Sequence, residues 1–357
     1  MSRTSTDSPT TTDAPPADAA PADAAPADAG GDGPPPPTMQ CMEVWGGNQV
    51  ADSAVAVGGL DAWVYCRPFE DADGGGDVYY VSACATGRIT RLLLADVSGH
   101  GAAVCDVAGQ LRGLMRRYVN YLDQTAFVRS MNDQFVDLSD AGCFATAVVT
   151  TFFAPTGYLS VCNAGHPPPL VYRAKERRWS YMEARADPAA DPVAEAEPKN
   201  IPLGILHVAD YEQFEERLDV GDLVLCYTDS LIEARDAAGN LFLAEGLLDV
   251  VRGVDPSDPA TFIPRLLSAV TARATGGLGA DDVTVLLFRP NGAGRRMTLR
   301  QRVMAPVRLL GALARSLRRG GDPMPWPDFR LANVGGALFG PLSRRWKGRR
   351  GEMLNAE

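Results

Sequence analysis

Four short segments of the 357-residue chain place an aspartate where a predicted β-strand meets a tight turn. Asp77 follows three glycines and opens an apolar run, whereas Asp96 and Asp229 each end such a run. The fourth segment has two adjacent carboxylates, Asp281 and Asp282, before another apolar run. A single aspartate at such a position is usually a turn former or a helix cap. Four at strand ends, from which side chains project beyond a sheet edge, indicate one shared site.

Several ionised carboxylates cannot share a pocket without a counter-charge, because like charges a few ångströms apart repel strongly. Divalent cations supply that charge. The chain has three histidines and no C-x-x-C pair, so its oxygen ligands favour Mg²⁺ or Mn²⁺ over zinc. Such ions most often act on phosphate groups. The residues therefore predict a magnesium or manganese site that acts on a phosphorylated substrate.

The elements that must position these aspartates are short strands and two helices, between about residues 54 and 290. Strands are predicted where β-rich runs lie between turn signals, at 78–83, 89–95, 144–152, 158–162, 170–172, 222–227 and 283–288. Helical spacing of apolar residues predicts helices over 104–118 and 127–138. Because strands and helices come in runs and pairs, without strict β-α alternation, we predict antiparallel sheets covered by helices. The stretch 184–199 is expected to be a poorly ordered surface insertion.

Five motifs containing these residues follow one another in an order known from one protein family. They are Gly75-Gly76-Asp77, Asp96-Val97-Ser98-Gly99-His100-Gly101, the run from Asn163 to Leu170, Gly221-Asp222-Leu223 with Tyr227-Thr228-Asp229, and Asp281-Asp282-Val283-Thr284. Each motif is weak alone, but their order and spacing are specific. Together they resemble the metal-dependent, protein phosphatase 2C-like serine/threonine phosphatases, and among these the bacterial sporulation and stress-response branch. The resemblance covers residues 60–290, about two thirds of the chain.

The resemblance implies an α/β fold of the α+β type, in which two packed antiparallel sheets are flanked by helix pairs and two Mn²⁺ or Mg²⁺ ions lie at one end. Asp77 and Asp96 are the expected catalytic ligands of the bridged ion pair, and the backbone carbonyl of Val97 is a further expected ligand. Asp229 and Asp281 are the expected carboxylates of the second ion. Asp282 is expected to support the turn. The implied chemistry is direct hydrolysis, in which a metal-activated hydroxide attacks phosphorus in line without a phospho-enzyme.

The chain departs from the family pattern in three places. Tyr80 stands where relatives commonly have an acidic residue, which predicts altered metal affinity. Ser230 replaces the usual glycine after the third ligand, which questions the local turn geometry. His100 lies four residues after Asp96, whereas the proton-donating histidine of eukaryotic members lies two residues after it. We expect His100 to cap or orient the turn, with a general-acid role as the alternative.

A phosphate site also calls for a cation that binds the phosphoryl oxygens. Arg67 precedes the glycine-rich stretch and is the candidate, with a structural salt bridge as the alternative. Arg88, Arg91 and Arg112 each fit a solvated face. His166 is expected to have a structural role beneath the site.

Charge is distributed unevenly along the chain. The net charge is −10, yet residues 295–357 hold fourteen Lys/Arg and four Asp/Glu, a balance of +10, so the rest carries −20. Apolar residues recur among these arginines and predict a basic amphipathic helical tail that packs on this protein or an acidic partner, with an anionic membrane surface as the alternative. No aromatic stacking pattern accompanies the charge, which argues against nucleic acid as a partner. Residues 1–40, rich in Ala, Pro and Asp, predict a disordered tether.

The chain shows neither a run of about 18 apolar residues nor a signal region, and its seven cysteines are scattered. We therefore expect a cytoplasmic protein with reduced cysteines, associated with membranes only through its tail. The leading hypothesis is a phosphatase that acts on phosphoserine or phosphothreonine of a bacterial regulatory protein, such as an anti-sigma-factor antagonist. The alternative is a catalytically inactive scaffold that binds phosphoproteins. A nucleotide cyclase is excluded, because its Gly-Gly-Asp signature continues with an acidic residue and Phe, whereas Val78 and Tyr79 follow here.

Overall fold

The computed structural model describes residues 44–293, except 84–87, 100–101, 120, 122, 139–141, 184–198, 276 and 279–280. The predicted tether, nearly all of the predicted 184–199 insertion and the predicted basic tail lie outside the described residues. No helix in the described part of the chain combines the length and apolar character needed to cross a membrane.

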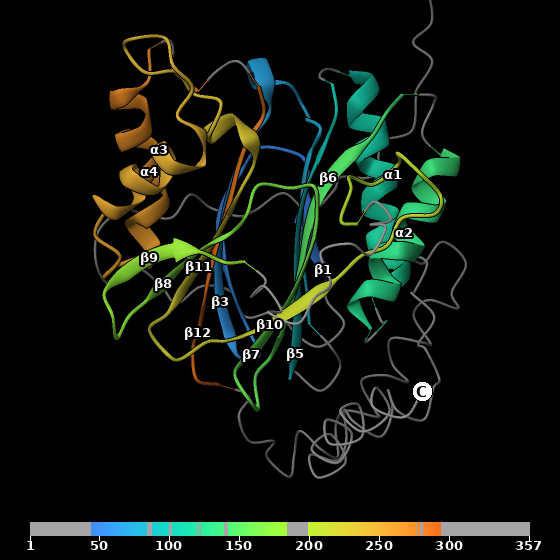
Figure 1. Ribbon diagram of the computed structural model, residues 1–357, viewed down its shortest axis with the longest axis horizontal. Coiled ribbons are helices and arrows are strands. Elements are labelled where there is room, and N and C mark those ends of the chain that lie inside the picture. Colours follow the sequence, from blue (N-terminus) through green and yellow to red (C-terminus); the bar gives the residue numbers. More distant parts are fainter. Residues whose placement is uncertain are drawn as a thin grey trace, which may run out of the picture.

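Two six-stranded antiparallel sheets pack face to face in the middle of the molecule (Figure 1). The first sheet has the order β1 (Val44–Gly47), β4 (Asp77–Ala83), β5 (Ile89–Val97), β6 (Ala145–Phe153), β7 (Tyr158–Ala164) and β10 (Gln213–Arg217). The second has the order β2 (Ala51–Val57), β3 (Leu60–Arg67), β12 (Val283–Pro290), β11 (Leu223–Tyr227), β8 (Leu170–Arg173) and β9 (Arg178–Tyr181). This confirms the predicted fold class.

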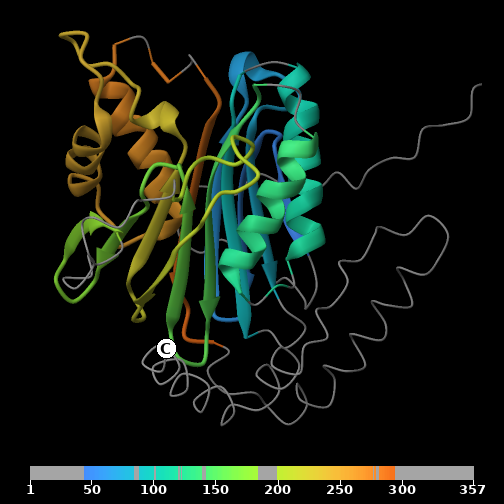
Figure 2. The same cartoon turned by 45° about the vertical axis from the view of Figure 1, so that its right-hand side comes forward.

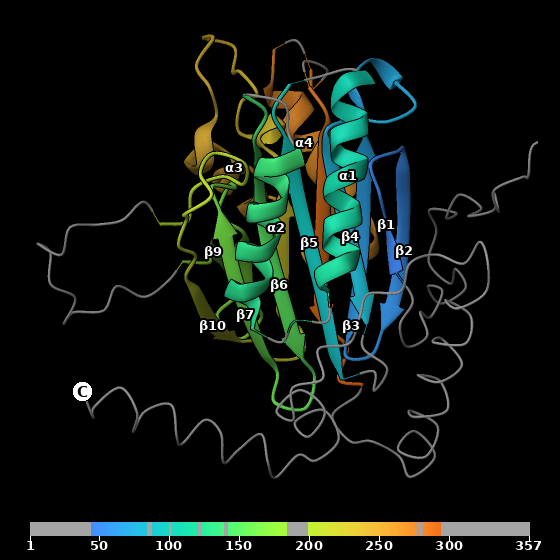
Figure 3. The same cartoon turned by 90° about the vertical axis from the view of Figure 1, so that its right-hand side faces the viewer.

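A pair of helices covers the outer face of each sheet, so that the fold has four layers (Figure 2). The first sheet is covered by α1 (Ala102–Tyr118) and α2 (Gln124–Leu138), which lie in front of it in Figure 3. The second is covered by α3 (Leu243–Arg252) and α4 (Pro259–Arg273). Two short 3₁₀ helices, η1 (Phe69–Asp71) and η2 (Asp229–Leu231), follow β3 and β11.

Each central strand contributes side chains to two cores, because successive residues point to opposite faces of a sheet. On β5, Leu92 and Leu94 enter the core between the sheets, whereas Leu93 and Ala95 pack against the helices. Strands that are buried on both faces have nearly continuous apolar sequences. The central strands were therefore predictable from the sequence. The same alternation places Asp96, two residues after Leu94, on the intersheet face.

β1 and the start of β2 precede residue 54, where the sequence pattern first predicts folded structure. The pattern of apolar residues in the sequence also did not predict β1, β2, β3, β9, β10, α3 and α4. β10 illustrates the reason: it is an edge strand with the polar sequence QFEER and only partial burial. A strand that pairs on one side and faces water lacks the apolar signal that marks a central strand.

Arg88 and Arg91 are buried, which corrects their predicted place on solvated faces. Arg91 points from β5 toward the helices, and its guanidinium lies 4.6 Å from the centre of the Phe127 ring. It donates hydrogen bonds to the carbonyl oxygens of Val119, at 2.8 Å, and Tyr121, at 2.5 Å. Arg91 therefore fixes the connection between α1 and α2 to the first sheet.

Replacing this arginine should destabilise the fold. Arg91→Met keeps much of the side-chain volume but leaves the two carbonyl groups without their donor, so we expect the free energy of unfolding to fall by roughly 2–4 kcal/mol. Urea denaturation monitored by circular dichroism measures this. Arg252→Met, which removes a half-exposed arginine paired with Asp249 on α3, is the control and should cost less than about 1 kcal/mol. Equal losses in the two variants would contradict the assigned role.

Candidate functional site

The predicted carboxylates meet at one end of the sandwich, where β3, β5 and β11 end and β4 and β12 begin. This is the upper end in Figure 1, next to η1. Asp77 and Asp96 are directly opposite each other in the β4–β5 pair. Both lie on the intersheet face, and the Cβ atoms of such opposite residues are about 4.5–5.5 Å apart. Strand register thus brings together two residues that are 19 positions apart in the chain.

Asp77 is the innermost of these carboxylates, with 1% of its surface exposed. Its Oδ2 accepts a hydrogen bond of 2.9 Å from the hydroxyl of Thr228, at the end of β11. That hydroxyl in turn accepts a 3.0 Å bond from the backbone N–H of Thr284 on β12. Burial, and then the charge of Asp96, raises the pKa of Asp77 well above its usual range. The second sheet therefore orients a carboxylate that belongs to the first.

Negative charge accumulates around Asp96 and Asp229. Burial raises the pKa of Asp96 to about 7, and the charges of Asp229 and Asp281 act in the same direction. Burial, followed by the charges of Glu233 and Asp281, raises the pKa of Asp229 to about 6. The neighbouring charges that act on these two carboxyls are acidic. The geometry thus concentrates carboxylates that repel one another.

Asp282 has a supporting position, as the sequence predicted. Its Oδ1 accepts a 2.6 Å hydrogen bond from the backbone N–H of Phe69, and its Oδ2 accepts bonds from Gly76, at 2.5 Å, and Asp77, at 3.3 Å. These bonds use its carboxylate to hold the glycine-rich loop against the second sheet. A Cβ atom on Gly75 would lie 2.4 Å from Asp282 Oδ2, so only glycine permits this approach.

Asn48 holds the same loop from the other side. Its backbone carbonyl accepts from Gly75 N–H at 2.9 Å, and its side-chain amide donates to the Gly75 carbonyl at 3.0 Å. Asn48, Glu233 and the roles of Thr228 and Thr284 were not predicted from the sequence. Thr228 and Thr284 both belong to the motifs described above. A polar β-branched residue at the end of an apolar strand is the sequence feature that could have indicated their role.

The remaining predicted residues lie around this centre. Val97 ends β5, and its backbone N–H donates to the Gly76 carbonyl at 3.3 Å. Arg67 is exposed and follows Cys66, which lies in the intersheet core, so the alternation of the strand places Arg67 on the other face. In the β3–β12 pair it lies opposite Val283, the residue that follows Asp282. His100 lies outside the described residues.

The departures from the family pattern leave the carboxylate cluster intact. Tyr80 is fully buried against the helices, on the opposite face of β4 from Asp77, so a carboxylate at this position would not face the cluster. This argues against the predicted effect on metal affinity. Ser230 lies within η2 and has a negative φ, so this turn does not require glycine.

His166 is a structural residue. It is buried, and its Nδ1 lies 2.8 Å from the hydroxyl of Thr146, the residue opposite Asp96 on β6. Burial lowers the pKa of His166 to about 3, so the ring is neutral at pH 7.

The chemistry of this donor set fits a hard divalent cation. The set consists of carboxylates, and the neighbouring charges that raise the pKa of Asp96 and Asp229 most are acidic. Within the described residues, however, no three His, Cys, Asp or Glu side chains are grouped closely enough to hold an ion as they stand. Binding an ion therefore requires these side chains to lie closer together than they do here.

The fold and this carboxylate end define a protein phosphatase 2C-like domain. Residues 86–291, more than half of the chain, match the family model described as Stage II sporulation protein E (SpoIIE). The chain belongs to this family, which confirms the resemblance drawn from its motifs.

Three known proteins are similar to parts of this chain. Phosphoserine phosphatase RsbU of Bacillus subtilis is 25% identical over 158 residues, 42% of this chain and 41% of that protein, so the match spans less than half of the relative. The solved RsbU and RsbW domains of a Mycobacterium tuberculosis protein are 26% identical, with a TM-score of 0.52, over 72% of this chain and 69% of theirs. The SiaA-PP2C domain of Pseudomonas aeruginosa, 16% identical with a TM-score of 0.51, covers 64% of this chain and 84% of its own and shares the fold.

The contact between Gly75 and Asp282 predicts an effect for a single methyl group. Gly75→Ala forces the loop away from Asp282, so we expect about 2–3 kcal/mol of destabilisation together with weaker metal binding. The matched control is Gly109→Ala on α1, where an added Cβ meets nothing within 4 Å and should stabilise the helix by about 0.5–1 kcal/mol. Urea denaturation and Mn²⁺ titration calorimetry test both variants. Similar behaviour of the two would contradict the model of a tightly fitted loop.

Carboxylate repulsion predicts a dependence of stability on pH. A carboxyl group whose pKa is higher in the folded than in the unfolded state destabilises the fold as it ionises, so the penalty from Asp96 is absent below about pH 4 and complete above about pH 7. Asp96→Asn should therefore raise the free energy of unfolding by roughly 1–3 kcal/mol at pH 8 in the presence of chelator, and by much less at pH 4.5. Urea denaturation at both pH values, with exposed Asp249→Asn as the control, gives the comparison. A gain that is independent of pH would exclude the ionisation of the buried Asp96 carboxyl as its cause.

Proposed function

We propose that this chain is a metal-dependent phosphatase that hydrolyses phosphoserine or phosphothreonine in a protein substrate. The observation that carries the proposal is the convergence of Asp77, Asp96, Asp229 and Asp281 at one end of a SpoIIE-family fold. The description of RsbU as a phosphoserine phosphatase supports the assignment of reaction and substrate class.

Two Mn²⁺ or Mg²⁺ ions are the cofactors in this proposal. Asp77, Asp96 and the Val97 carbonyl would hold one side of the ion pair, and Asp229 with Asp281 would hold the other. When bound, such ions activate water and offset charge on phosphoryl oxygens. The protein's own contribution is orientation: Thr228 and Asp282 fix Asp77 and its loop before a ligand arrives.

The burial of the carboxylates suits a phosphate carried on a protein. Asp77 is buried, Asp96 is partly buried and Asp281 is exposed, so the site runs from the intersheet core to the surface. A phosphorylated side chain can enter at the exposed side while the body of its protein stays outside.

A covalent route through a cysteine has no support from the nearest thiol. Cys66 lies in the intersheet core beside the site, where Thr284 Oγ1 donates to its Sγ at 3.3 Å. Burial raises the pKa of this thiol to about 12, so it is protonated at neutral pH and is a poor nucleophile. This favours direct attack by water.

The substrate we propose is a phosphorylated bacterial regulatory protein, such as an anti-sigma-factor antagonist. The catalytically inactive scaffold is the competing function, and it makes the opposite prediction for turnover. Docking of the basic tail on an acidic partner or an anionic membrane, and a cytoplasmic location, remain predictions from sequence.

Hydrolysis of an aryl phosphate and of a phosphothreonine peptide tests the proposal. Wild-type protein should turn over both with Mn²⁺ or Mg²⁺ and neither with chelator. Asp96→Asn and Asp281→Asn should each lower kcat/KM at least about 100-fold, because each removes a charge that binds the cations. Asp249→Asn, a change of the same type at an exposed position on α3, should leave kcat/KM unchanged.

Phosphate release by wild type that is insensitive to chelator would overturn the metal-dependent mechanism. Stoichiometric Mn²⁺ binding without turnover of either compound would favour the scaffold.

A further inference from the structure

Five apolar side chains are exposed on the loop between residues 203 and 210 or at the neighbouring ends of α2 and β6. Ile205, Leu206 and Val208 lie in the loop between residues 203 and 210, Leu138 ends α2, and Phe144 precedes β6. Val208 is the most exposed of them, at 83%. We refer to these five residues as the apolar rim. Clustered exposed apolar residues commonly mark interaction surfaces.

The loop that carries the rim is held firmly from inside. The backbones of Leu203 and Ala145 exchange two hydrogen bonds, of 2.9 and 2.7 Å. The buried amide of Asn132 on α2 donates to the Leu206 carbonyl at 2.7 Å and accepts from Gly204 N–H at 3.0 Å. Leu203 and Ala209, on either side of the exposed stretch, are buried in the core under the helices. The exposed residues are thus displayed by an ordered loop.

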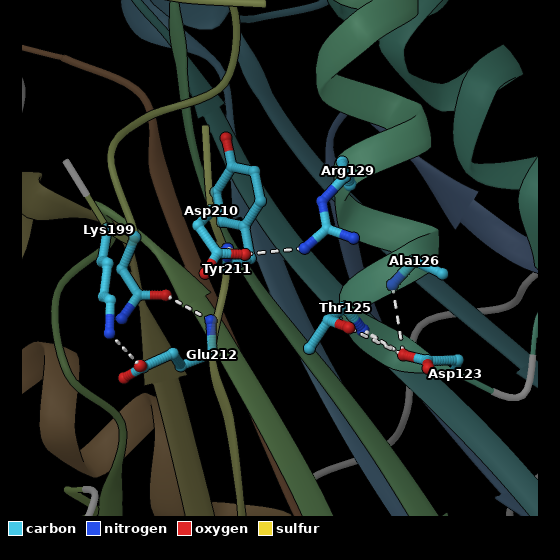
Figure 4. Close-up of polar contacts among 9 residues, drawn as sticks. Asp123, Thr125, Ala126, Arg129, Lys199, Asp210, Tyr211 and Glu212 are labelled. Atoms are coloured by element: carbon cyan, nitrogen blue, oxygen red, sulfur yellow. Dashed lines mark hydrogen bonds and ion pairs between the residues drawn. The ribbon is translucent and has the colours of Figure 1, made fainter. Parts of the chain in front are cut away.

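Ion pairs close the base of this loop (Figure 4). Arg129 on α2 lies 2.6 Å from Asp210, and Lys199 lies 2.6 Å from Glu212. The backbone N–H of Asn200 donates to the Asp210 carbonyl at 2.8 Å. Fixing backbone and side chains costs conformational entropy. Holding apolar side chains in water adds no compensating burial, so the arrangement points to a partner that covers them.

Phe144 joins the rim to the carboxylate end of the first sheet. The backbone N–H of Phe144 donates to the hydroxyl of Ser98 at 3.0 Å, and Ser98 N–H donates to the Phe144 carbonyl at 2.8 Å. The next residues of β6, Ala145 and Thr146, lie opposite Val97 and Asp96. In Figure 3 the loop, coloured yellow-green, lies beside the upper end of α2, the end at which the site is located.

We propose that the apolar rim is the docking surface for the phosphoprotein substrate and binds apolar side chains that flank its phosphorylated residue. This rests on the proposed function. A protein whose phosphoresidue reaches Asp96 must bring neighbouring residues over the surface next to β5 and β6, and the rim occupies that surface. The rim thus selects substrates by sequence, whereas the carboxylates act on any phosphate that reaches them.

Two fifteen-residue phosphothreonine peptides of equal charge test this proposal. One has Leu, Val and Phe on both sides of a central phosphothreonine, and the other has Gln, Ser and Asn at the same positions. Seven residues on each side span about 25 Å when extended, enough to reach from the site across neighbouring loops. Fluorescence anisotropy gives Kd on wild type and on hydrolysis-impaired Asp96→Asn, and phosphate release gives kcat/KM on the peptides and on an aryl phosphate.

Wild type should bind the apolar peptide about tenfold more tightly than the polar one. Val208→Asn should reduce this preference to about threefold or less and leave aryl phosphate hydrolysis unchanged, whereas Val208→Leu should retain the preference. Val220→Asn is the matched control: Val220 is 56% exposed in the turn between β10 and β11, at the opposite end of the sandwich, and its replacement should change nothing.

Equal Kd values for the two peptides on wild type would overturn the proposal, as would an equal loss of preference in Val220→Asn. A preference that depends on Val208 but occurs without hydrolysis of any compound would support the docking surface and refute the phosphatase. The protein's own tail is the competing occupant. If Leu310→Ser with Leu313→Ser in the full chain strengthens binding of the apolar peptide about tenfold, the tail covers the rim and the assignment to substrate is wrong.

Discussion

The pairing of β4 with β5 places two aspartates opposite each other at the end of a dry core, and the rest of the site depends on this constraint. Burial raises the pKa of both carboxyls, and the charge of Asp96 raises that of Asp77 further, so the two groups resist ionising together. Asp77 cannot turn away, because Thr228 and the backbone of the second sheet fix its carboxylate. The repulsion is therefore built into the register of the sheet, and it diminishes only through protonation or a bound cation.

The four layers around the site tolerate this local cost. Three apolar cores separate the layers, and β4 and β5 are buried on both faces along most of their length. A scaffold of this kind can hold a locally unfavourable cluster without losing its register, since shifting a strand by one residue would expose its apolar side chains. Asp282 shows how the two requirements meet, because its carboxylate belongs to the acidic cluster and also accepts three backbone hydrogen bonds.

Apolar runs and the order of the motifs predicted the antiparallel sheets, and the family resemblance supplied the flanking helix pairs and the expected ligands Asp77, Asp96, Asp229 and Asp281. These features depend on local patterns: buried strands read as apolar runs, and each aspartate interrupts or opens one. The roles of Asn48 and Thr228 depend on contacts between residues 27 and 151 positions apart, which no local pattern encodes. Arg91 was misjudged for a related reason, because its partners are backbone carbonyls that any residue could supply. The apolar rim was not predicted, because only its exposure in the folded structure distinguishes Val208 from a core valine.

At the opposite end of the sandwich, acidic residues have a structural role and are paired with basic side chains. Asp222, immediately before β11, is buried like Asp77, but Arg173 donates to it at 3.1 Å, and the backbone N–H groups of Ala174 and Asp219 donate as well. Lys175 pairs with Asp219 in the same region, and Arg173 also pairs with Glu216. Acidic groups at that end are thus neutralised by the protein's own cations, whereas at the other end of β11 the strongest neighbours of Asp229 are Glu233 and Asp281. Within the described residues, basic side chains thus balance the acidic groups at one end of the sandwich, whereas the charges that act most on Asp96 and Asp229 at the other end are acidic. Protonation or a bound cation would relieve that repulsion.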